Sequence, residues 1–334
     1  MVEVQPHRRC PISSLHTLFT KRVLFLVGKG GVGKTILATA LALAASRQGK
    51  KTLLIELEGN TRAARLLGVP VRREPSDDPQ SVFPTLFVLS VSGQTALEEY
   101  LRLIFPVKRL LRMILESRLY QYFVAAAPGL RELLSMGKIW YEERKHEKDT
   151  LQPRWDLLIV DMPATGHSLQ YLRMPRAARD TFGSGMVHRE AERIMALFSD
   201  PSKTVMNLVT VPEELAVSET LEAYHQLRTD LGLPVGRLFV NRVRHTPLSS
   251  TALARIRIGA SVRSRDRQLA KHVLRHAQTE ATLKEVQAPY LHRLKTLSVP
   301  TVYVPFYFAE EFGLPQVEQL SYMLEQSDEQ TYPA

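Results

Sequence analysis

The string GKGGVGKT, residues 28–35, constrains the fold of this 334-residue chain more than any other feature. It follows an apolar, β-branched run from Val23 to Val27 and precedes a stretch with helical spacing of apolar residues, Ile36 to Arg47. A glycine-rich turn between a strand and a helix lets backbone N–H groups converge on phosphate oxygens, and the helix N-terminus adds its positive dipole end. We therefore predict a strand, a phosphate-binding loop and a helix, the P-loop arrangement.

Each position in the loop has a predicted task. The residues predicted to surround the phosphates with backbone N–H groups are Gly28, Gly30, Gly31, Val32 and Gly33. Lys34 is predicted to reach the β- and γ-phosphates, and Thr35 to place its hydroxyl on Mg²⁺. The predicted cofactors are therefore ATP and Mg²⁺.

A dinucleotide-binding fold is the alternative, because the same residues contain G-x-G-x-x-G. An acid, Glu56 or Glu58, also follows at about the spacing of a ribose-binding residue. That fingerprint does not require Lys-Thr immediately after its third glycine, whereas a P-loop does. A glycine-rich turn without a ligand is disfavoured as well, since four glycines in six residues carry an entropic cost that a plain turn does not need.

The rest of the chain predicts a sheet around this loop. Short apolar runs of strand length alternate with stretches of helical spacing. The predicted strands are Val23 to Val27, Thr52 to Leu57, Leu86 to Val91, Leu157 to Asp161, Val205 to Val211, Arg237 to Val240 and Thr301 to Val304. This alternation indicates an α/β fold, a doubly wound and mostly parallel sheet with helices on both faces.

Three segments depart from simple alternation. Residues 94–149 are apolar with helical spacing, and they predict a helical subdomain inserted in the main domain. Ser249 to Leu297 is a long polar and basic stretch, predicted to form a surface helix. The piece from Pro70 to Pro84 is rich in turn residues and predicts an exposed loop. The predicted organisation is an N-terminal extension, residues 1–21, followed by one P-loop domain, residues 22–330.

Composition excludes several classes of protein. Cys10 is the only cysteine, so a single chain can form neither a disulfide framework nor a cysteine-rich metal site. No run approaches the ~20 apolar residues that a transmembrane helix needs, and the N-terminal stretch is too polar for the core of a signal peptide. We expect a cytoplasmic protein. The net charge of +10 is spread along the chain and does not by itself select a partner.

A second set of site residues follows the predicted strand from Leu157. Asp161 ends that strand, at the edge of the sheet where ligands bind in doubly wound folds, and is predicted to hold Mg²⁺ as the Walker B acid. Pro163 to Gly166 predict a tight loop in which the Gly166 amide senses a γ-phosphate. His167 could act as a base, but phosphoryl transfer depends mainly on positioning and charge, which favours a role in structuring this loop.

These strings together resemble the ArsA family, which comprises arsenite-pump ATPases and the homologous factor that targets tail-anchored membrane proteins. The resemblance rests on GKGGVGKT and DMPATGHSLQYLRMP. Three further segments are similar to those of the family: VTVPEELAVSET (209–220), FVNRV (239–243) and YVPFYFAEEFGLP (303–315). The likeness extends from about Arg22 to Leu320. Met162 is a departure, because the family's Walker B segment usually has the form D-T-A-P-T-G-H.

The resemblance implies further site residues. Lys29, after the first glycine of the loop, is typical of the deviant Walker A group, in which this lysine reaches the partner's nucleotide across a dimer. A solvated lysine is the alternative. The resemblance also implies that Asn241 hydrogen-bonds the adenine edge and that Pro305 and Phe306 pack against the ring. An asparagine that completes its own turn is the alternative for Asn241.

The acid that positions the attacking water differs from the family pattern. The family has an aspartate in a D-P-A sequence, whereas this chain has LLIELEGNTRAARLLG, in which Glu58 aligns with that aspartate. Glu56 lies two residues earlier and so faces the same side of the predicted strand, which leaves either acid able to approach the nucleotide. Because glutamate is one methylene longer than aspartate, its carboxylate reaches a different position, and hydrolysis is expected to be slow. The predicted switch loop that responds to the γ-phosphate comprises Gly59, Asn60, Arg62 and Arg65.

The resemblance leaves several roles open. The first expectation is a dimeric ATPase, a homodimer or a heterodimer with a paralogue, whose nucleotide state moves a helical effector surface within Leu97 to Met136. A hydrophobic client or a membrane-protein partner would bind there, although helices that simply cover the sheet are the alternative. A weakly hydrolysing regulatory subunit is the second candidate. An arsenite- or anion-pump subunit is disfavoured by the isolated Cys10, and nucleic acid is disfavoured by the family motifs.

Overall fold

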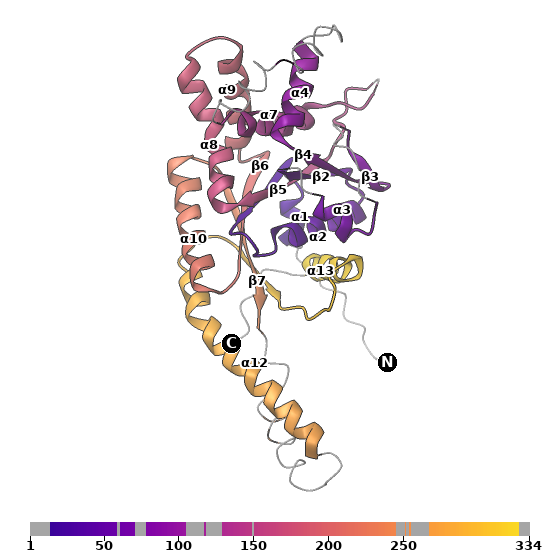
Figure 1. The fold of residues 1–334 in the computed structure, drawn as a ribbon, viewed down its shortest axis with the longest axis vertical. Helices are drawn as coiled ribbons and strands as arrows, with labels where there is room; N and C mark the ends of the chain where they lie inside the picture. Colours follow the sequence, from indigo (N-terminus) through magenta and orange to yellow (C-terminus); the bar gives the residue numbers. More distant parts are fainter. Residues whose placement is uncertain are drawn as a thin grey trace, which may run out of the picture.

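The computed structural model describes residues 14–58, 61–70, 78–104, 117, 129–148, 150–244, 251, 254 and 267–326. Within these ranges an eight-stranded sheet has the order β3-β4-β2-β5-β1-β6-β7-β8 (Figure 1). The strands are β1 Val23–Gly28, β2 Thr52–Leu57, β3 Gln80–Phe83, β4 Leu86–Val91, β5 Leu157–Ala164, β6 Thr204–Thr210, β7 Val235–Val243 and β8 Thr301–Pro305. All neighbouring strands pair in parallel except β3 with β4. The predicted mostly parallel α/β sheet is confirmed.

Helices cover both faces of the sheet. The described helices are α1 Ser14–Leu18, α2 Lys34–Arg47, α3 Arg62–Leu66, α4 Gly93–Ile104, α7 Leu130–Arg144, α8 Thr165–Phe182, α9 Met186–Ser199, α10 Glu214–His225, η1 Gln226–Asp230 (a π-helix), α12 Arg267–Leu294 and α13 Leu314–Gln326. Alternate residues of the central strand β1 point to opposite faces, so Phe25 packs with α7 to α10 while Leu24 and Leu26 pack with α1, α2 and α13. Both faces of the strand are fully buried, as expected of a parallel sheet between helices.

The antiparallel strand β3 corrects the predicted exposed loop from Pro70 to Pro84. Residues 80–83 pair with β4 through a tight turn at Pro84 and Thr85, and Val82 and Phe83 pack against the core that contains α2. The burial of these two side chains stabilises the strand. The polar residues around it are the reason that the sequence pattern predicted a loop. Residues 71–77 lie outside the described part of the chain.

The N-terminal part of the chain contributes to the core. Leu15, Leu18 and Phe19, in and just after α1, are buried in the same cluster as α2. Packed structure therefore begins ahead of residue 22.

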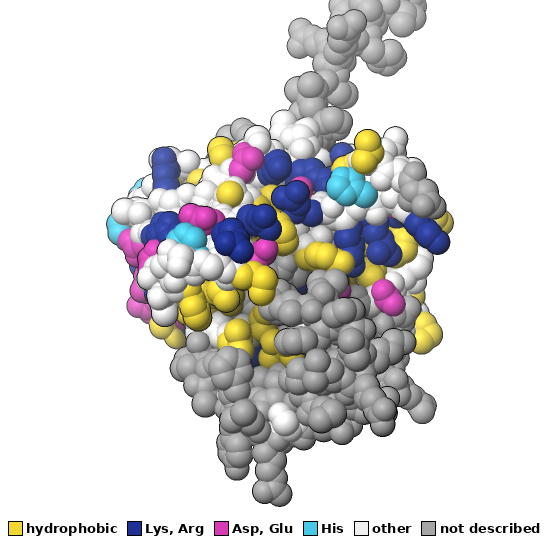
Figure 2. Space-filling model, turned by 90° about the horizontal axis from the view of Figure 1, so that it is seen from above, with side chains coloured by type: hydrophobic (Ala, Val, Ile, Leu, Met, Phe, Trp, Pro, Cys, Tyr) yellow, Lys and Arg dark blue, Asp and Glu magenta, His cyan; other side chains and the backbone are white. Residues whose placement is uncertain are grey.

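The helices at one end of the sheet form a layer of their own. In Figure 1, α4, α7, α8 and α9 lie together at the top, where α4 and α7 fall within the predicted subdomain and α8 and α9 pack on α7. Seen from that end, the surface carries many lysine and arginine side chains with hydrophobic ones between them (Figure 2). Pro106, Met113 and Pro128 of the predicted subdomain lie outside the described residues.

The basic stretch predicted from Ser249 to Leu297 forms α12 over its second half. This helix extends away from the sheet at the end of the molecule opposite to α9 (Figure 1), and Leu269 and Val286 are exposed on it. Arg255 to Arg265 lie outside the described residues. Among the helices that can be described, none is both long enough and apolar enough to cross a membrane.

Candidate nucleotide site

The P-loop joins β1 to α2 at the centre of the sheet. Gly31 and Gly33 have φ angles of 84° and 96°, in the left-handed region that favours glycine. A Cβ on Gly33 would collide with the Asn241 amide, and a Cβ on Gly28 would collide with the Val209 carbonyl oxygen. The first turn of α2 has no side-chain cap, so its backbone N–H groups remain available to a ligand. The glycines are thus required by packing as well as by the predicted phosphates.

Lys34 lies folded over the loop. Its Nζ donates hydrogen bonds to the Gly28 carbonyl at 2.7 Å and to the Lys29 carbonyl at 2.9 Å, and only 8% of the residue is exposed. Burial lowers the pKa of this ammonium group, while the carboxylate of Asp161 opposes that shift. A negatively charged ligand in the loop would add to that opposing effect and stabilise the charged form of Lys34.

Thr35 and Asp161 form a pair at the carboxyl edge of the sheet. The Thr35 hydroxyl donates to Asp161 Oδ2 at 2.6 Å, and burial raises the pKa of this carboxyl to about 6. Asp161 Oδ1 is buried and has no hydrogen-bond partner among the described residues. A hydroxyl beside an unpartnered carboxylate oxygen is a donor set that suits Mg²⁺, which prefers hard oxygen ligands. The residues therefore fit the predicted metal.

The segment after Asp161 differs from its prediction. β5 continues to Ala164 and passes directly into α8 at Thr165, so Pro163 to Gly166 do not form the predicted tight loop. Ala164 pairs with Gly28 in the sheet, which extends the strand. Gly166 lies in the first turn of α8, which has no side-chain cap and so presents free N–H groups at this edge. His167 is helical as well, so the loop-structuring role predicted for it is wrong.

Glu56, near the end of β2, and Glu58, just after it, have different environments. β2 ends at Leu57, and Glu58 follows with a φ of 64°, so the two glutamates do not share one side of a strand as predicted. Glu56 is 1% exposed and its Oε1 accepts a hydrogen bond from the Ala63 N–H at 3.0 Å. Glu58 is exposed, and its Oε1 lies 3.3 Å from Nδ1 of the exposed His167. Of these two acids, only Glu58 therefore faces solvent.

The predicted switch loop is partly helical. Arg62 and Arg65 lie on the short helix α3 rather than in a loop, which corrects the prediction for these two residues. The buried carboxylate of Glu56 accepts from the backbone at the start of α3, which stabilises this turn of helix. Gly59 and Asn60 lie outside the described residues.

Lys29 forms an ion pair within the chain. Its Nζ lies 2.5 Å from Oε1 of Glu219 on α10, and both side chains are partly exposed. Sequence reasoning did not identify Glu219, because a partner 190 residues away leaves no local pattern.

Asn241, near the end of β7, makes a hydrogen bond to the P-loop. Its Nδ2 donates to the Val32 carbonyl at 2.8 Å, and its Oδ1 accepts from the Arg242 N–H at 2.9 Å. Both Asn241 and Arg242 lie within β7, so the hydrogen bond to Val32 joins the strand to the loop and the side chain does not complete a turn, and the adenine contact of Asn241 remains a prediction. Arg242, with a φ of 59°, also donates from its guanidinium to the Gly31 carbonyl at 3.0 Å, a contact that sequence reasoning missed.

Pro305 and Phe306 lie where β8 ends. Pro305 is the last residue of the strand, and the N–H of Phe306 donates to the Val243 carbonyl at 3.0 Å. The Arg244 guanidinium lies over the Phe306 ring, 3.6 Å from its centroid, and also pairs with Glu280 of α12 at 2.8 Å. The Arg244 guanidinium thus occupies one face of this ring, while Phe306 as a whole is 37% exposed. The contact of Pro305 and Phe306 with adenine remains a prediction.

The loop, its lysine, the hydroxyl and acid pair, and the free N-terminus of α8 meet at the carboxyl edge of a parallel sheet. This combination defines a P-loop nucleoside-triphosphate-binding protein. Residues 21–188 match the model of the ArsA family, described as anion-transporting ATPase, and the chain belongs to this family. The predicted resemblance is therefore confirmed.

Several similar proteins are described as ATPases. ATPase BagA of Mycobacterium tuberculosis H37Rv is 31% identical over 303 residues, which cover 85% of this chain and 87% of that protein. The arsenical pump-driving ATPase of Escherichia coli is 25% identical over 271 residues, 73% of this chain and 42% of that protein. The protein of the same description from Acidiphilium multivorum is 25% identical over 242 residues, 66% of this chain and 39% of that protein. The chain thus spans less than half the length of these two pump-driving ATPases.

Proposed function

We propose that the chain binds ATP with Mg²⁺ and hydrolyses it as a dimeric switch. The observation that carries this proposal is the Thr35 and Asp161 pair, in which one buried carboxylate oxygen lacks a hydrogen-bond partner in the described chain. Buried polar atoms without partners are rare in folded proteins and often mark the place of an ion. The buried Lys34 on the same loop supports a polyanionic ligand.

Binding would exchange the internal contacts of the loop for contacts with phosphate. Lys34 would leave the Gly28 and Lys29 carbonyls for phosphate oxygens, and the N-termini of α2 and α8 would direct N–H groups at the same charge. Thr35 and Asp161 would hold the metal, which supplies neutralisation of the charge that develops on the phosphates. These residues do the positioning and electrostatic work on which phosphoryl transfer depends.

Glu58 is the residue proposed to orient the attacking water. Of Glu56 and Glu58 it is the exposed acid, and the His167 ring lies within hydrogen-bond distance of one of its carboxylate oxygens. His167 is thus proposed as a positioning residue for Glu58. Glu56 is proposed to stabilise the start of α3, because its carboxylate is buried against that helix.

Helix α8 is proposed to transmit the nucleotide state. It begins at Thr165 beside the site and ends at Phe182 in the layer of α4, α7 and α9, and Gly129 ahead of α7 packs closely on Met174 of α8. A shift at its N-terminus would therefore reach the predicted effector surface. Lys29 would exchange Glu219 for the partner's nucleotide when two copies, or this chain and a paralogue, associate. Because ATP is the proposed substrate, the cytoplasm remains the expected compartment.

The proposal is tested on the purified chain by calorimetry and by single-turnover phosphate release. ATP is expected to bind only with Mg²⁺ present, and Asp161→Asn is expected to lower turnover by roughly 100-fold, as removal of a charge-stabilising group does. Asp230→Asn, at an exposed acid on η1, is the matched control and should leave turnover unchanged. Absence of ATP binding would overturn the proposal, as would a fully active Asp161→Asn variant.

The same assay separates the alternatives. Binding of ATP without measurable hydrolysis in the wild-type chain would favour the regulatory subunit. Arsenite is expected to cause no increase in turnover, and a saturable increase would favour the anion-pump subunit.

A further inference from the structure

A cavity of about 440 Å³ lies between α4, α7 and α9, and all of its lining residues belong to the described chain. Much of its wall consists of hydrophobic and aromatic side chains, including Leu133, Leu134, Trp140 and Tyr141 of α7, Phe182 at the end of α8 and Ile194 of α9. The wall is kept open at Gly137, where an added Cβ would lie 3.8 Å from Ile194, an ordinary contact distance. None of the predicted nucleotide-site residues is among those that line this space.

The volume limits what can occupy the cavity. Small-molecule sites measure about 300–1,000 Å³, so the cavity is of ordinary size for a ligand. A single alkyl chain is a ligand of this size class.

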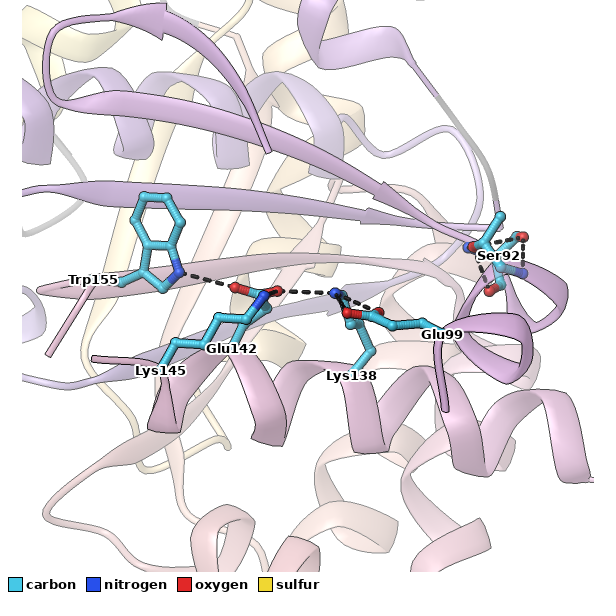
Figure 3. A network of polar contacts seen from close by, with 7 residues as sticks. Ser92, Glu99, Lys138, Glu142, Lys145 and Trp155 are labelled. Atoms are coloured by element: carbon cyan, nitrogen blue, oxygen red, sulfur yellow. Dashed lines mark hydrogen bonds and ion pairs between the residues drawn. The ribbon is translucent and has the colours of Figure 1, made fainter. Parts of the chain in front are cut away.

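The charged groups in the wall limit the head group. Three charged side chains, Glu99, Lys138 and Glu190, line the cavity. Lys138 is 5% exposed and already lies between two carboxylates, 2.5 Å from Glu99 and 2.9 Å from Glu142 (Figure 3). An incoming anion would have to compete with both acids for this ammonium group and would also meet the carboxylates of Glu99 and Glu190. A neutral hydroxyl can instead donate a hydrogen bond to Glu99, since a carboxylate accepts more than the contacts that Lys138 makes.

We propose that this cavity binds a single-chain amphiphile with an uncharged, hydroxyl-bearing head group. The alkyl chain would lie among Leu133, Leu134 and Ile194, and the hydroxyl would donate to the Glu99 carboxylate. The proposal assigns a ligand class to the effector surface of the proposed function. It depends on that function only for the link between ligand binding and ATP. The ligand is bound by the apolar wall and selected by the Glu99 and Lys138 pair.

The test uses the full chain without nucleotide and monoacylglycerols of eight, ten and twelve acyl carbons, kept below their micelle concentrations. Binding is followed by calorimetry and by tryptophan fluorescence, since Trp140 lines the cavity while Trp155 is fully buried elsewhere. The affinity is expected to rise about fourfold for each added methylene, the equivalent of about 0.8 kcal/mol per buried CH₂. Dodecanoic acid is expected to bind at least tenfold more weakly than the monoacylglycerol of the same chain length.

Two substitutions identify the cavity and the head-group contact. Gly137→Leu fills the space beside Ile194 and should weaken binding at least tenfold, whereas Gly137→Ala adds only an ordinary contact and should change it less than threefold. Glu99→Gln should raise the relative affinity for the fatty acid, because a repelling charge is removed. Circular dichroism and the affinity for ATP are measured on each variant, and both are expected to stay at wild-type values.

Several results would overturn this assignment. Affinity that does not change with chain length or with Gly137→Leu would show that the cavity is not the binding site. Equal affinity for the acid and the monoacylglycerol would remove the proposed head-group contact. Displacement of the ligand by a twenty-residue apolar peptide with higher affinity would make a client helix the occupant instead. Failure of ATP binding with intact amphiphile binding would overturn the ATPase proposal and leave this one standing.

Discussion

Glu56 and Asp161 occupy facing positions on the neighbouring parallel strands β2 and β5, and each buries one carboxylate oxygen for which the described residues provide no hydrogen-bond donor. Burial raises the pKa of Glu56 to about 7 and that of Asp161 to about 6, and the Asp161 charge contributes to the shift of Glu56. Two adjacent buried acids cannot both ionise at low energetic cost unless a cation joins them. This relationship supports the Mg²⁺ site proposed at this point of the sheet.

The metal-free chain should lose stability as the pH rises from about 4 to 7. Both carboxyls bind a proton more tightly in the folded state than in the unfolded state, so the unfolded state releases protons first and the free energy of unfolding falls through this window. The expected loss from the two groups together is on the order of 5 kcal/mol. Urea unfolding in EDTA across this range measures it.

Asp161→Asn is the matched variant for this prediction. The amide keeps a hydrogen-bonding partner for Thr35 but carries no charge, so the variant should unfold with a flatter pH dependence and be more stable than the wild type near pH 8. A wild-type chain whose stability rises over the same window would contradict the argument.

Replacement of Glu58 by glycine is expected to raise the stability of the chain and to lower its activity. A non-glycine residue with a φ of 64° carries about 1–2 kcal/mol of backbone strain. Glu58→Gly removes this strain, but the extra flexibility of glycine in the unfolded state offsets part of the benefit. The free energy of unfolding should therefore rise by up to about 1 kcal/mol. The same variant should lower turnover by roughly 100-fold, because the proposed water-positioning carboxylate is absent. Urea unfolding and single-turnover hydrolysis measure the two effects.

Arg242→Gly is the control for the effect of backbone strain on stability. Arg242 also has a positive φ, but its guanidinium donates to the Gly31 carbonyl, so removal of the side chain loses a contact with the loop. Its stability gain should therefore be smaller than that of Glu58→Gly. A Glu58→Gly chain that is less stable than the wild type by more than about 1 kcal/mol would remove the strain argument.

The sheet was predictable because strands such as β1, β2 and β6 are buried on both faces and so form short, largely apolar runs. The bounds of β2 and β4 match their predicted ranges, and β5 and β7 continue further than their apolar cores indicate. Strand β3 was missed because its four residues follow a segment rich in proline and acidic residues, and only its pairing with β4 buries Val82 and Phe83.

The candidate site was predictable as far as it is local in sequence. GKGGVGKT and the acid at the end of β5 identify Lys34, Thr35 and Asp161 without any knowledge of the fold. The conformation of Glu58 was not predictable, because a strand pattern assumes that alternation continues past Leu57. The contact of Arg242 with the loop joins residues 211 positions apart, which no local pattern reveals.

Lys29→Ala should lower turnover by roughly 100-fold while the affinity for ATP changes little, if the lysine acts on the partner's nucleotide. The ion pair with Glu219 is partly exposed and is worth at most about 1 kcal/mol, so the lysine can leave it readily. Glu219→Gln should therefore leave turnover unchanged or raise it up to about threefold. Turnover measured against protein concentration, with light scattering for the mass, tests both variants. Full activity of Lys29→Ala at concentrations where the dimer forms would exclude a role for this lysine.

Removing one partner of the buried pair Lys138 and Glu142 is expected to cost more stability than breaking an exposed ion pair. Glu142 is fully buried and accepts hydrogen bonds from Lys145 at 2.6 Å and from the Trp155 indole at 3.1 Å, besides its contact with Lys138. Burial alone would raise the pKa of Glu142, but Lys138 and Lys145 outweigh it and hold the pKa below its ordinary value. Removal of one charge from such a cluster leaves the others buried without compensation.

Glu142→Ala should therefore destabilise the chain by about 3–5 kcal/mol, whereas Glu147→Ala, which breaks an exposed pair with Lys51, should cost less than about 1 kcal/mol. The double variant Lys138→Met with Glu142→Leu should be more stable than Glu142→Ala alone, because both buried charges are then replaced by apolar groups. Urea unfolding of the four chains, wild type included, measures these differences. If Glu142→Ala and Glu147→Ala prove equally stable, the Glu142 cluster does not hold α7 against the strand that follows Trp155, and the wall of the cavity beside Lys138 must be stabilised by apolar packing alone.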